Sequence, residues 1–123
     1  MLASSDLMAF AATSDAARAT GFYRDVLGLE LVEEQPYAVV FRANGTTLRV
    51  QKVREVTPAA YTMLGWVVPD IATTVAALGE KGVAFERYEG IQQDALGVWA
   101  TPGGGKVAWF KDPDGNLLSL SQA

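Results

Sequence analysis

The stretch SDAARATGFYRDVLGLEL, residues 14–31, decides how the first part of the chain folds. Ser14 and Asp15 supply side-chain oxygens that cap the start of a helix, and Gly28 is the kind of residue that ends one. Between them, apolar side chains recur at helical spacing, at Ala19, Phe22, Tyr23, Val26 and Leu27. The pattern therefore predicts a short helix after Asp15, followed by a strand over 29–34.

Strand patterns lie on both sides of this helix. A short apolar run predicts a strand over 7–13, and Pro36 separates the strand at 29–34 from another at 37–42. Asn44 and Gly45 form a strong hairpin signal, because both can adopt positive φ, and 46–52 is the return strand. The first part of the chain is thus predicted to be a βαβββ module over about 1–53.

The second half repeats this order after a linker at about 53–60, which contains Pro58. Strands are predicted over 61–68, 83–87, 106–111 and 116–121, and the helix begins after Asp70 and ends at Gly82. The Gly-rich insertion at 89–105 is interpreted as a flexible connection rather than a phosphate loop. We expect one α+β domain over 1–123, with the second module over about 60–123.

A single helix in each module has a physical consequence. It covers one face of four strands and leaves the other face in need of a partner. Two modules, from one chain or from two, can curl their open faces towards each other as a curved mixed sheet with the helices outside. We expect a cleft between those faces.

Composition excludes several classes of function. The 123 residues include no Cys and no His, which removes disulfides, thiolate and imidazole metal ligands, and Cys–His or Ser–His nucleophiles. The net charge of −4, without a Lys/Arg cluster, argues against nucleic acid or an anionic membrane as a partner. No basic targeting region or long apolar run is present, so we expect a soluble, cytoplasmic protein.

Three motifs carry a resemblance to a known family, namely FYRDVLGL at 22–29, LGWVVPDI at 64–71 and DPDGN at 112–116. With them the chain resembles, over essentially its whole length, the vicinal oxygen chelate superfamily of glyoxalases, extradiol dioxygenases and bleomycin-resistance proteins. The resemblance implies paired βαβββ modules and a homodimer that exchanges modules between chains. It is specific for the fold and not for the chemistry.

The resemblance also implies where a metal would bind. Catalytic members usually place His, Gln or Glu ligands at four points, which fall here on Met8, Arg49, Met63 and Ser119, with Gln51 one strand period after Arg49. These residues cannot hold a divalent cation, so we expect no metal and no cofactor. The chain is most similar to the non-catalytic, drug-sequestering branch, and methionine suits sites for flat ligands.

Aromatic side chains are the main candidate ligand contacts. Met8 and Phe10 share the strand face of the ligand points, and for both, as for Met63, a cleft position and a core position are equally compatible with the pattern. Trp99 is expected to stack on a ligand near the cleft mouth, with burial in a local cluster as the alternative. Tyr37 is either a stacking residue or a strand anchor.

Two tryptophans depend on strand faces. Because side chains alternate along a strand, Trp66 lies on the opposite face from Met63 and is expected to pack in the core against the second helix. Trp109 lies opposite Ser119 on the cleft face if 112–116 forms a type I turn with a Gly bulge, and a one-residue slip would bring Phe110 there instead.

Polar residues complete the predicted site. Arg49 and Gln51 face inward, so Arg49 needs a carboxylate, a ligand or water, unless both simply line a solvated wall. No carboxylate stands out as a general base, because the aspartates of DPDGN suit a turn and four glutamates suit solvated edges, at Glu33, Glu34, Glu86 and Glu89.

The sequence thus favours a metal-free protein that sequesters an aromatic antibiotic or other natural product, as a self-resistance or carrier protein without catalytic residues. One alternative is a lyase, isomerase or cyclase-like enzyme that works without metal through a displaced Asp or Glu. Another is a glyoxalase-like regulator or structural subunit that binds no ligand.

Overall fold

The computed structural model describes residues 1–123 and divides the chain into two compact units, Met1–Pro58 and Ala59–Ala123. The boundary falls inside the predicted linker. Each unit is a four-stranded mixed sheet with a helix, which confirms the α+β fold of two βαβββ modules. None of the helices has the length and apolar character that a membrane crossing requires.

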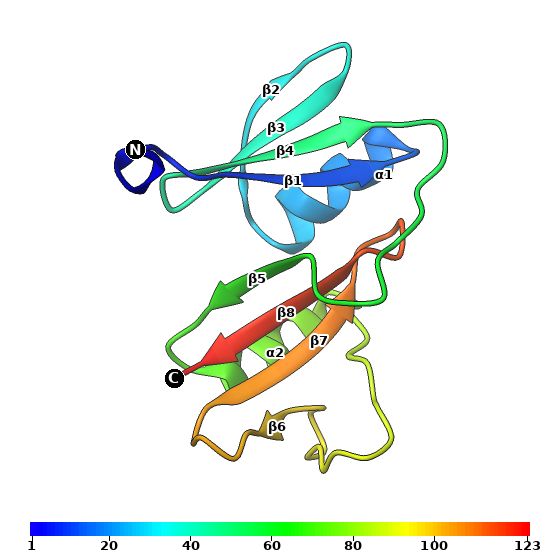
Figure 1. Cartoon of the computed structure of the whole chain (residues 1–123). Coiled ribbons are helices and arrows are strands. Elements are labelled where there is room, and N and C mark those ends of the chain that lie inside the picture. Colours follow the sequence, from blue (N-terminus) through cyan, green and yellow to red (C-terminus); the bar gives the residue numbers. More distant parts are fainter. The chain divides into compact units, whose positions relative to one another are not determined.

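The first unit has strand order β1-β4-β3-β2, in which β1 and β4 are parallel and the other neighbours antiparallel (Figure 1). Its elements follow the predicted order, with a short 3-10 helix, η1, at the start. Their bounds are η1 Leu2–Ser4, β1 Met8–Thr13, α1 Ala16–Thr20, η2 Gly21–Val26, β2 Glu30–Glu34, β3 Ala38–Ala43 and β4 Thr46–Lys52.

The helix of the first unit begins and ends as predicted, but its second half is a π-helix rather than an α-helix. The Asp15 carboxylate accepts from the Arg18 backbone N–H at 3.1 Å, and Gly28 takes φ 77° after the last turn. From Gly21 the backbone forms a π-helical segment, η2, in which the Leu27 N–H donates to the carbonyl of Phe22 at 3.0 Å.

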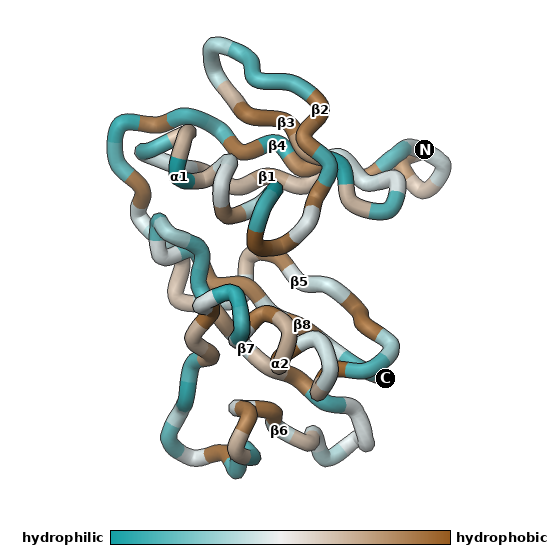
Figure 2. The backbone as a smooth tube through the Cα atoms, turned by 180° about the vertical axis from the view of Figure 1, so that it is seen from behind, coloured by the Kyte–Doolittle hydropathy of each residue, from teal (hydrophilic) through white to brown (hydrophobic).

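The core of the first unit lies between this helix and one face of the sheet. Tyr23 is fully buried there, with its ring centroid 5.6 Å from that of Phe41 on β3. The hydrophobic colour of β3 in Figure 2 matches its run of four buried residues at 38–41. Asn44 and Gly45 both take positive φ, which confirms the predicted hairpin turn.

The second unit has the same topology, with strand order β5-β8-β7-β6 and a parallel β5–β8 pair. The Asp70 carboxylate caps α2 by accepting from the Thr73 N–H at 3.2 Å. Buried apolar side chains, among them Phe110 and Leu118, form the core. The elements are β5 Leu64–Val67, α2 Ile71–Glu80, β6 Trp99–Ala100, β7 Lys106–Lys111 and β8 Leu117–Gln122.

The prediction of a strand over 83–87 is wrong. Only an isolated bridge between Phe85 and Phe110 remains, and the two-residue strand β6, inside the predicted insertion, takes the fourth place in the sheet. The Gln93 side chain takes the place of a neighbouring strand. Its Nε2 donates to the Glu86 carbonyl at 2.9 Å, and its Oε1 accepts from the Tyr88 N–H at 2.8 Å. These backbone groups are thus satisfied without a strand partner.

The turn between β7 and β8 sets the register of that hairpin. The Gly115 N–H donates to the Asp112 carbonyl and the Asp112 N–H to the Asn116 carbonyl, both at 3.0 Å. Trp109 consequently pairs with Ser119, and the alternative slip is excluded. The buried Asp112 carboxylate accepts from the backbone N–H groups of Asp114 and Asn116, as expected of a turn residue.

Candidate ligand-binding faces

The helix-free face of the first sheet carries the predicted residues of β1 and β4. In the parallel register Met8 pairs with Thr47, and Phe10 pairs with Arg49. Met8 and Phe10 are each 48% exposed, whereas Ala11, which points to the helix side, is buried. Met8 and Phe10 therefore do not belong to the buried core of this unit.

Arg49 lies half-buried in the middle of this face and is held by an amide. Its Nη1 donates to Gln35 Oε1 at 2.8 Å, and the Nε2 of Gln35 donates to Glu33 Oε2 at 3.1 Å. The sequence did not predict that Gln35 bonds Arg49 or that Glu33 bonds Gln35. A β-bulge between Leu31 and Glu33 shifts the register of β2 just before Gln35.

Gln51 and Tyr37 are the two other predicted contacts in the first unit. Gln51 follows Arg49 by one strand period and is exposed. Tyr37 precedes β3 and is 79% exposed, so its ring does not anchor the start of the strand.

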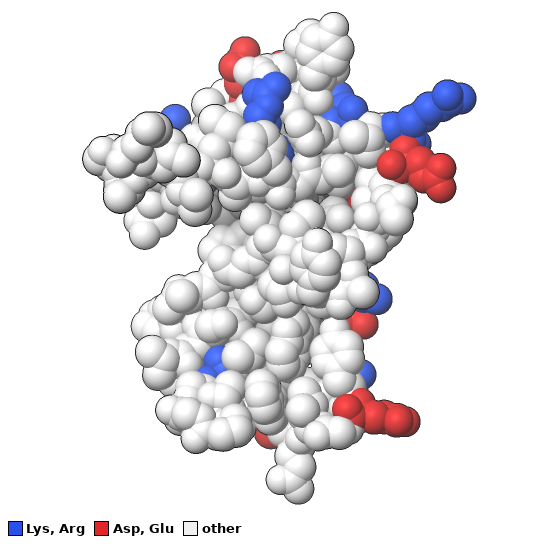
Figure 3. All heavy atoms as spheres, in the orientation of Figure 1, with Lys and Arg blue, Asp and Glu red and all other residues white.

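The helix-free face of the second sheet carries an aromatic cluster formed by Tyr88, Trp99 and Trp109. Trp99 and Trp109 are stacked, with ring centroids 6.1 Å apart and an angle of 26° between the planes. The ring of Tyr88 meets Trp109 edge-on at 5.4 Å and 86°. All three are partly exposed, and Figure 3 shows few charged atoms over the β7 and β8 strands on the visible side. Tyr88 was not predicted, because the loop that brings it to Trp109 has no periodic pattern.

Met63 and Ser119 lie on the same face as this cluster. The backbone N–H of Met63, just before β5, donates to the Leu117 carbonyl at 2.8 Å, and its side chain is half-buried. Ser119 is 8% exposed and pairs with Gly65 on β5. A Cβ atom on Gly65 would lie 2.7 Å from Ser119 Oγ, so any larger residue there would push the hydroxyl aside.

Trp66 lies on the opposite face, as predicted. Its ring stacks on that of Phe110, with centroids 6.5 Å apart and an angle of 26°. Because Phe110 is fully buried, Trp66 is part of the packing on the helix side rather than of the aromatic cluster.

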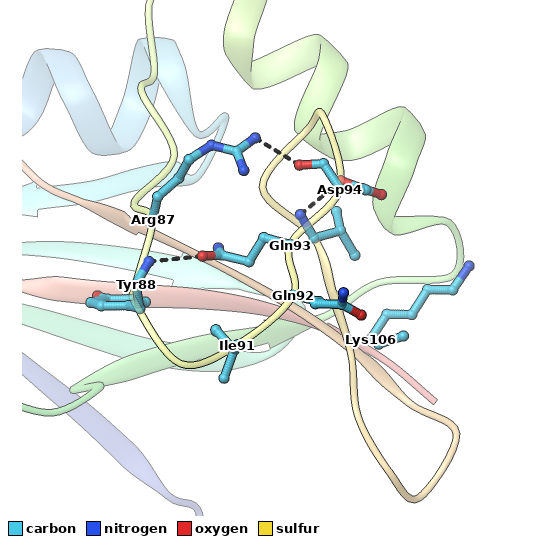
Figure 4. Close-up of a pocket in the computed structure, with 9 residues that line it drawn as sticks. Arg87, Tyr88, Ile91, Gln92, Gln93, Asp94 and Lys106 are labelled. Atoms are coloured by element: carbon cyan, nitrogen blue, oxygen red, sulfur yellow. Dashed lines mark hydrogen bonds between the residues drawn. The ribbon is translucent and has the colours of Figure 1, made fainter.

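A pocket of about 600 Å³ lies beside β6 (Figure 4). It is lined from the strands by Ala100 and Lys106, which alternate with Trp99 and Val107 and so point to the other face of the sheet. Tyr88 of the aromatic cluster also lines this pocket, so the pocket adjoins the cluster. Within the loop at 87–98, the Arg87 guanidinium donates to the carbonyls of Asp94 and Ala95 at 2.6 and 3.0 Å. The loop at 87–98 that forms this pocket also carries Tyr88.

The four family positions for metal ligands do not suit a metal. They hold two thioethers, a hydroxyl and a guanidinium, the last already charged and bonded to Gln35. The structure also brings together no group of three or more His, Cys, Asp or Glu side chains. A divalent cation needs several oxygen, nitrogen or thiolate donors, so this donor set does not fit one.

Comparison with known proteins gives the same picture of the fold. The model of the Glyoxalase/Bleomycin resistance protein/Dioxygenase superfamily matches residues 7–120. A member of that superfamily from Sphaerobacter thermophilus DSM 20745 aligns over 100% of both chains, with 25% identity and a TM-score of 0.77. No curated protein matches the sequence.

Two further solved structures are similar. TnmS3, described as an antibiotic binding protein from Streptomyces sp. CB03234, aligns over 99% of this chain and 98% of its own, with 28% identity and a TM-score of 0.75. A lactoylglutathione lyase from Agrobacterium tumefaciens aligns over 98% and 94%, with 18% identity and a TM-score of 0.75. At 18% identity, the similarity to the lyase concerns the fold alone.

Proposed function

Because the chain belongs to the glyoxalase/bleomycin resistance protein/dioxygenase superfamily, we propose that it binds and sequesters an aromatic small molecule without a metal ion. The ligand class is an antibiotic or another natural product, and the role is that of a self-resistance or carrier protein acting in the cytoplasm. The similar structure of TnmS3, an antibiotic binding protein, supports this proposal.

The aromatic cluster is the observation that carries the proposal. Stacked tryptophans that remain partly exposed on a sheet face offer an apolar, flat surface to a planar ring. Offset stacking contributes about 0.5–1.5 kcal/mol per pair beyond the burial of apolar area. Tyr88 closes one edge of this surface and adds a second ring orientation.

The proposed contacts come from the helix-free face of each sheet. In the first unit they are Met8, Phe10, Tyr37, Arg49 and Gln51, and in the second Met63, Trp99, Trp109 and Ser119, to which the structure adds Tyr88. The family commonly completes such faces by exchange of modules between two chains, and we propose a homodimer for this chain as well.

A metal-free enzyme is the second candidate. One carboxylate supports it, since Glu33 is linked through Gln35 to Arg49 on the helix-free face of the first sheet. Such a carboxylate could serve as a base if a substrate carried its acidic proton nearby.

A titration with product analysis tests the proposal and separates the two candidates. A panel of aromatic antibiotics is added to the protein while tryptophan fluorescence is recorded, and each mixture is then analysed by mass spectrometry. We expect saturable quenching by at least one compound, which is recovered unchanged. Recovery of a converted compound would favour the enzyme, and the absence of quenching across the panel would contradict both.

A further inference from the structure

Arg49 occupies the centre of the helix-free face of the first sheet. In register, Phe10 lies beside it on β1 and Val40 lies beside it on β3. Apolar side chains therefore flank this cation on both sides, one of them 48% exposed and the other buried. A half-buried cation between apolar neighbours loses part of its hydration and gains from an anionic partner.

The chain supplies Arg49 with a neutral partner only. Its one hydrogen bond goes to the amide oxygen of Gln35, and it takes part in none of the ion pairs. Two other cations of the same sheet, Arg42 and Lys52, each pair with a glutamate, at 3.1 and 3.3 Å. The missing carboxylate is thus particular to Arg49.

The bond to Gln35 also orients the guanidinium. Gln35 is itself fixed by Glu33, so one edge of Arg49 is held at Nη1 while the edge formed by Nε and Nη2 keeps its N–H donors free. The same edge binds a carboxylate elsewhere in this chain, where Arg24 Nε and Nη2 donate to the two oxygens of Asp25 at 2.8 and 3.1 Å. Two parallel donors of this kind match a carboxylate group.

We infer that the ligand is an aromatic carboxylate whose anionic group is bound by the Nε–Nη2 edge of Arg49 while its ring lies against Phe10. The inference rests on the proposed binding function and names its ligand class. The exposed thioether of Met8, on the same strand face, adds a sulfur contact that suits an aromatic ring.

Two matched probes test this inference, anthracene-2-carboxylate and anthracene-2-carboxamide. They share the ring system and differ in charge, so their affinity ratio reports the anionic group alone. Both are titrated into the protein with detection by their own fluorescence. We expect the carboxylate to bind about tenfold more tightly or more, as charge-assisted hydrogen bonds allow. Added salt should reduce this preference, a measurement that needs no variant.

Three variants assign the preference to Arg49. Arg49→Gln should abolish this preference, because it weakens binding of the carboxylate far more than binding of the carboxamide. Arg49→Lys should retain part of the preference through charge without the paired donors. Arg24→Gln makes the same change of net charge on η2 and should leave the preference intact. Circular dichroism checks that each variant is folded.

The outcomes separate this inference from the proposed function. Equal affinity for the two probes, no binding of the carboxylate, or a preference that persists in Arg49→Gln would overturn the inference. If the antibiotic panel still binds in any of these cases, the proposed function stands. If neither the probes nor the panel bind, both are wrong.

Discussion

Replacement of two tryptophans tests the assignment of faces in the second sheet. Trp66 packs on the buried ring of Phe110, whereas Trp99 stacks on the partly exposed Trp109. Trp66→Ala removes a large side chain from the helix side, and because Trp66 is only half-buried we expect a loss of about 3 kcal/mol of unfolding free energy. Trp99→Ala loses its stacking on Trp109, about 0.5–1.5 kcal/mol, in addition to the contribution of the apolar area that the half-buried Trp99 ring buries.

The two substitutions should affect ligand affinity in the opposite order to stability. Trp99→Ala removes a ring that we propose to stack on the ligand, so the binding free energy should weaken by about 2 kcal/mol or more. Trp66→Ala should leave the affinity of the folded fraction nearly unchanged. The assays are urea unfolding followed by circular dichroism, and calorimetric titration with the tightest ligand of the panel below the onset of unfolding.

Trp99→Phe is the matched control, because it keeps an aromatic ring beside Trp109. It should retain more affinity than Trp99→Ala with similar stability. If Trp66→Ala weakens binding while Trp99→Ala mainly unfolds the protein, the assignment of strand faces is wrong. If neither substitution affects the affinity for any ligand that binds, the stacking proposal fails.

Three further predictions concern metal content, assembly and packing. Elemental analysis of protein purified without chelator should find no stoichiometric zinc, nickel or iron, and one equivalent of any of them would contradict the metal-free proposal. Sedimentation at micromolar concentration should give about twice the chain mass of 13.1 kDa, whereas a monomer would contradict the proposed homodimer. Gly65→Ala should lower stability by about 1 kcal/mol, because the new Cβ forces the Ser119 hydroxyl aside, and an added Ser119→Ala should restore part of the loss in thermal unfolding.

Local signals predicted most of the fold. Asp15, Asp70 and the turn at 112–116 each determine their structure through short-range hydrogen bonds, so their consequences are visible in sequence. The register of that turn also placed Trp109 opposite Ser119, and strand alternation placed Trp66 on the helix side.

The parts that were missed depend on side-chain contacts of two glutamines that belong to no recognisable motif. The Gln93 amide bonds the backbone of 86–88 and replaces a predicted strand by a loop, which carries Tyr88 to Trp109. Gln35, in the connection that follows the bulged strand β2, accepts a hydrogen bond from Arg49 on β4. Neither glutamine lies in a motif, and only the folded geometry identifies its partner.

The parallel pairing of β1 with β4 constrains the order in which the first unit folds. β3 and β4 are joined by the tight turn at Asn44 and Gly45, so their contacts are local and can form early. β1 must instead close a loop that contains the helix and two strands before it gains any partner, which carries a larger entropic cost. Mutations in the β3–β4 hairpin should therefore slow folding, whereas mutations at the β1 edge should mainly accelerate unfolding.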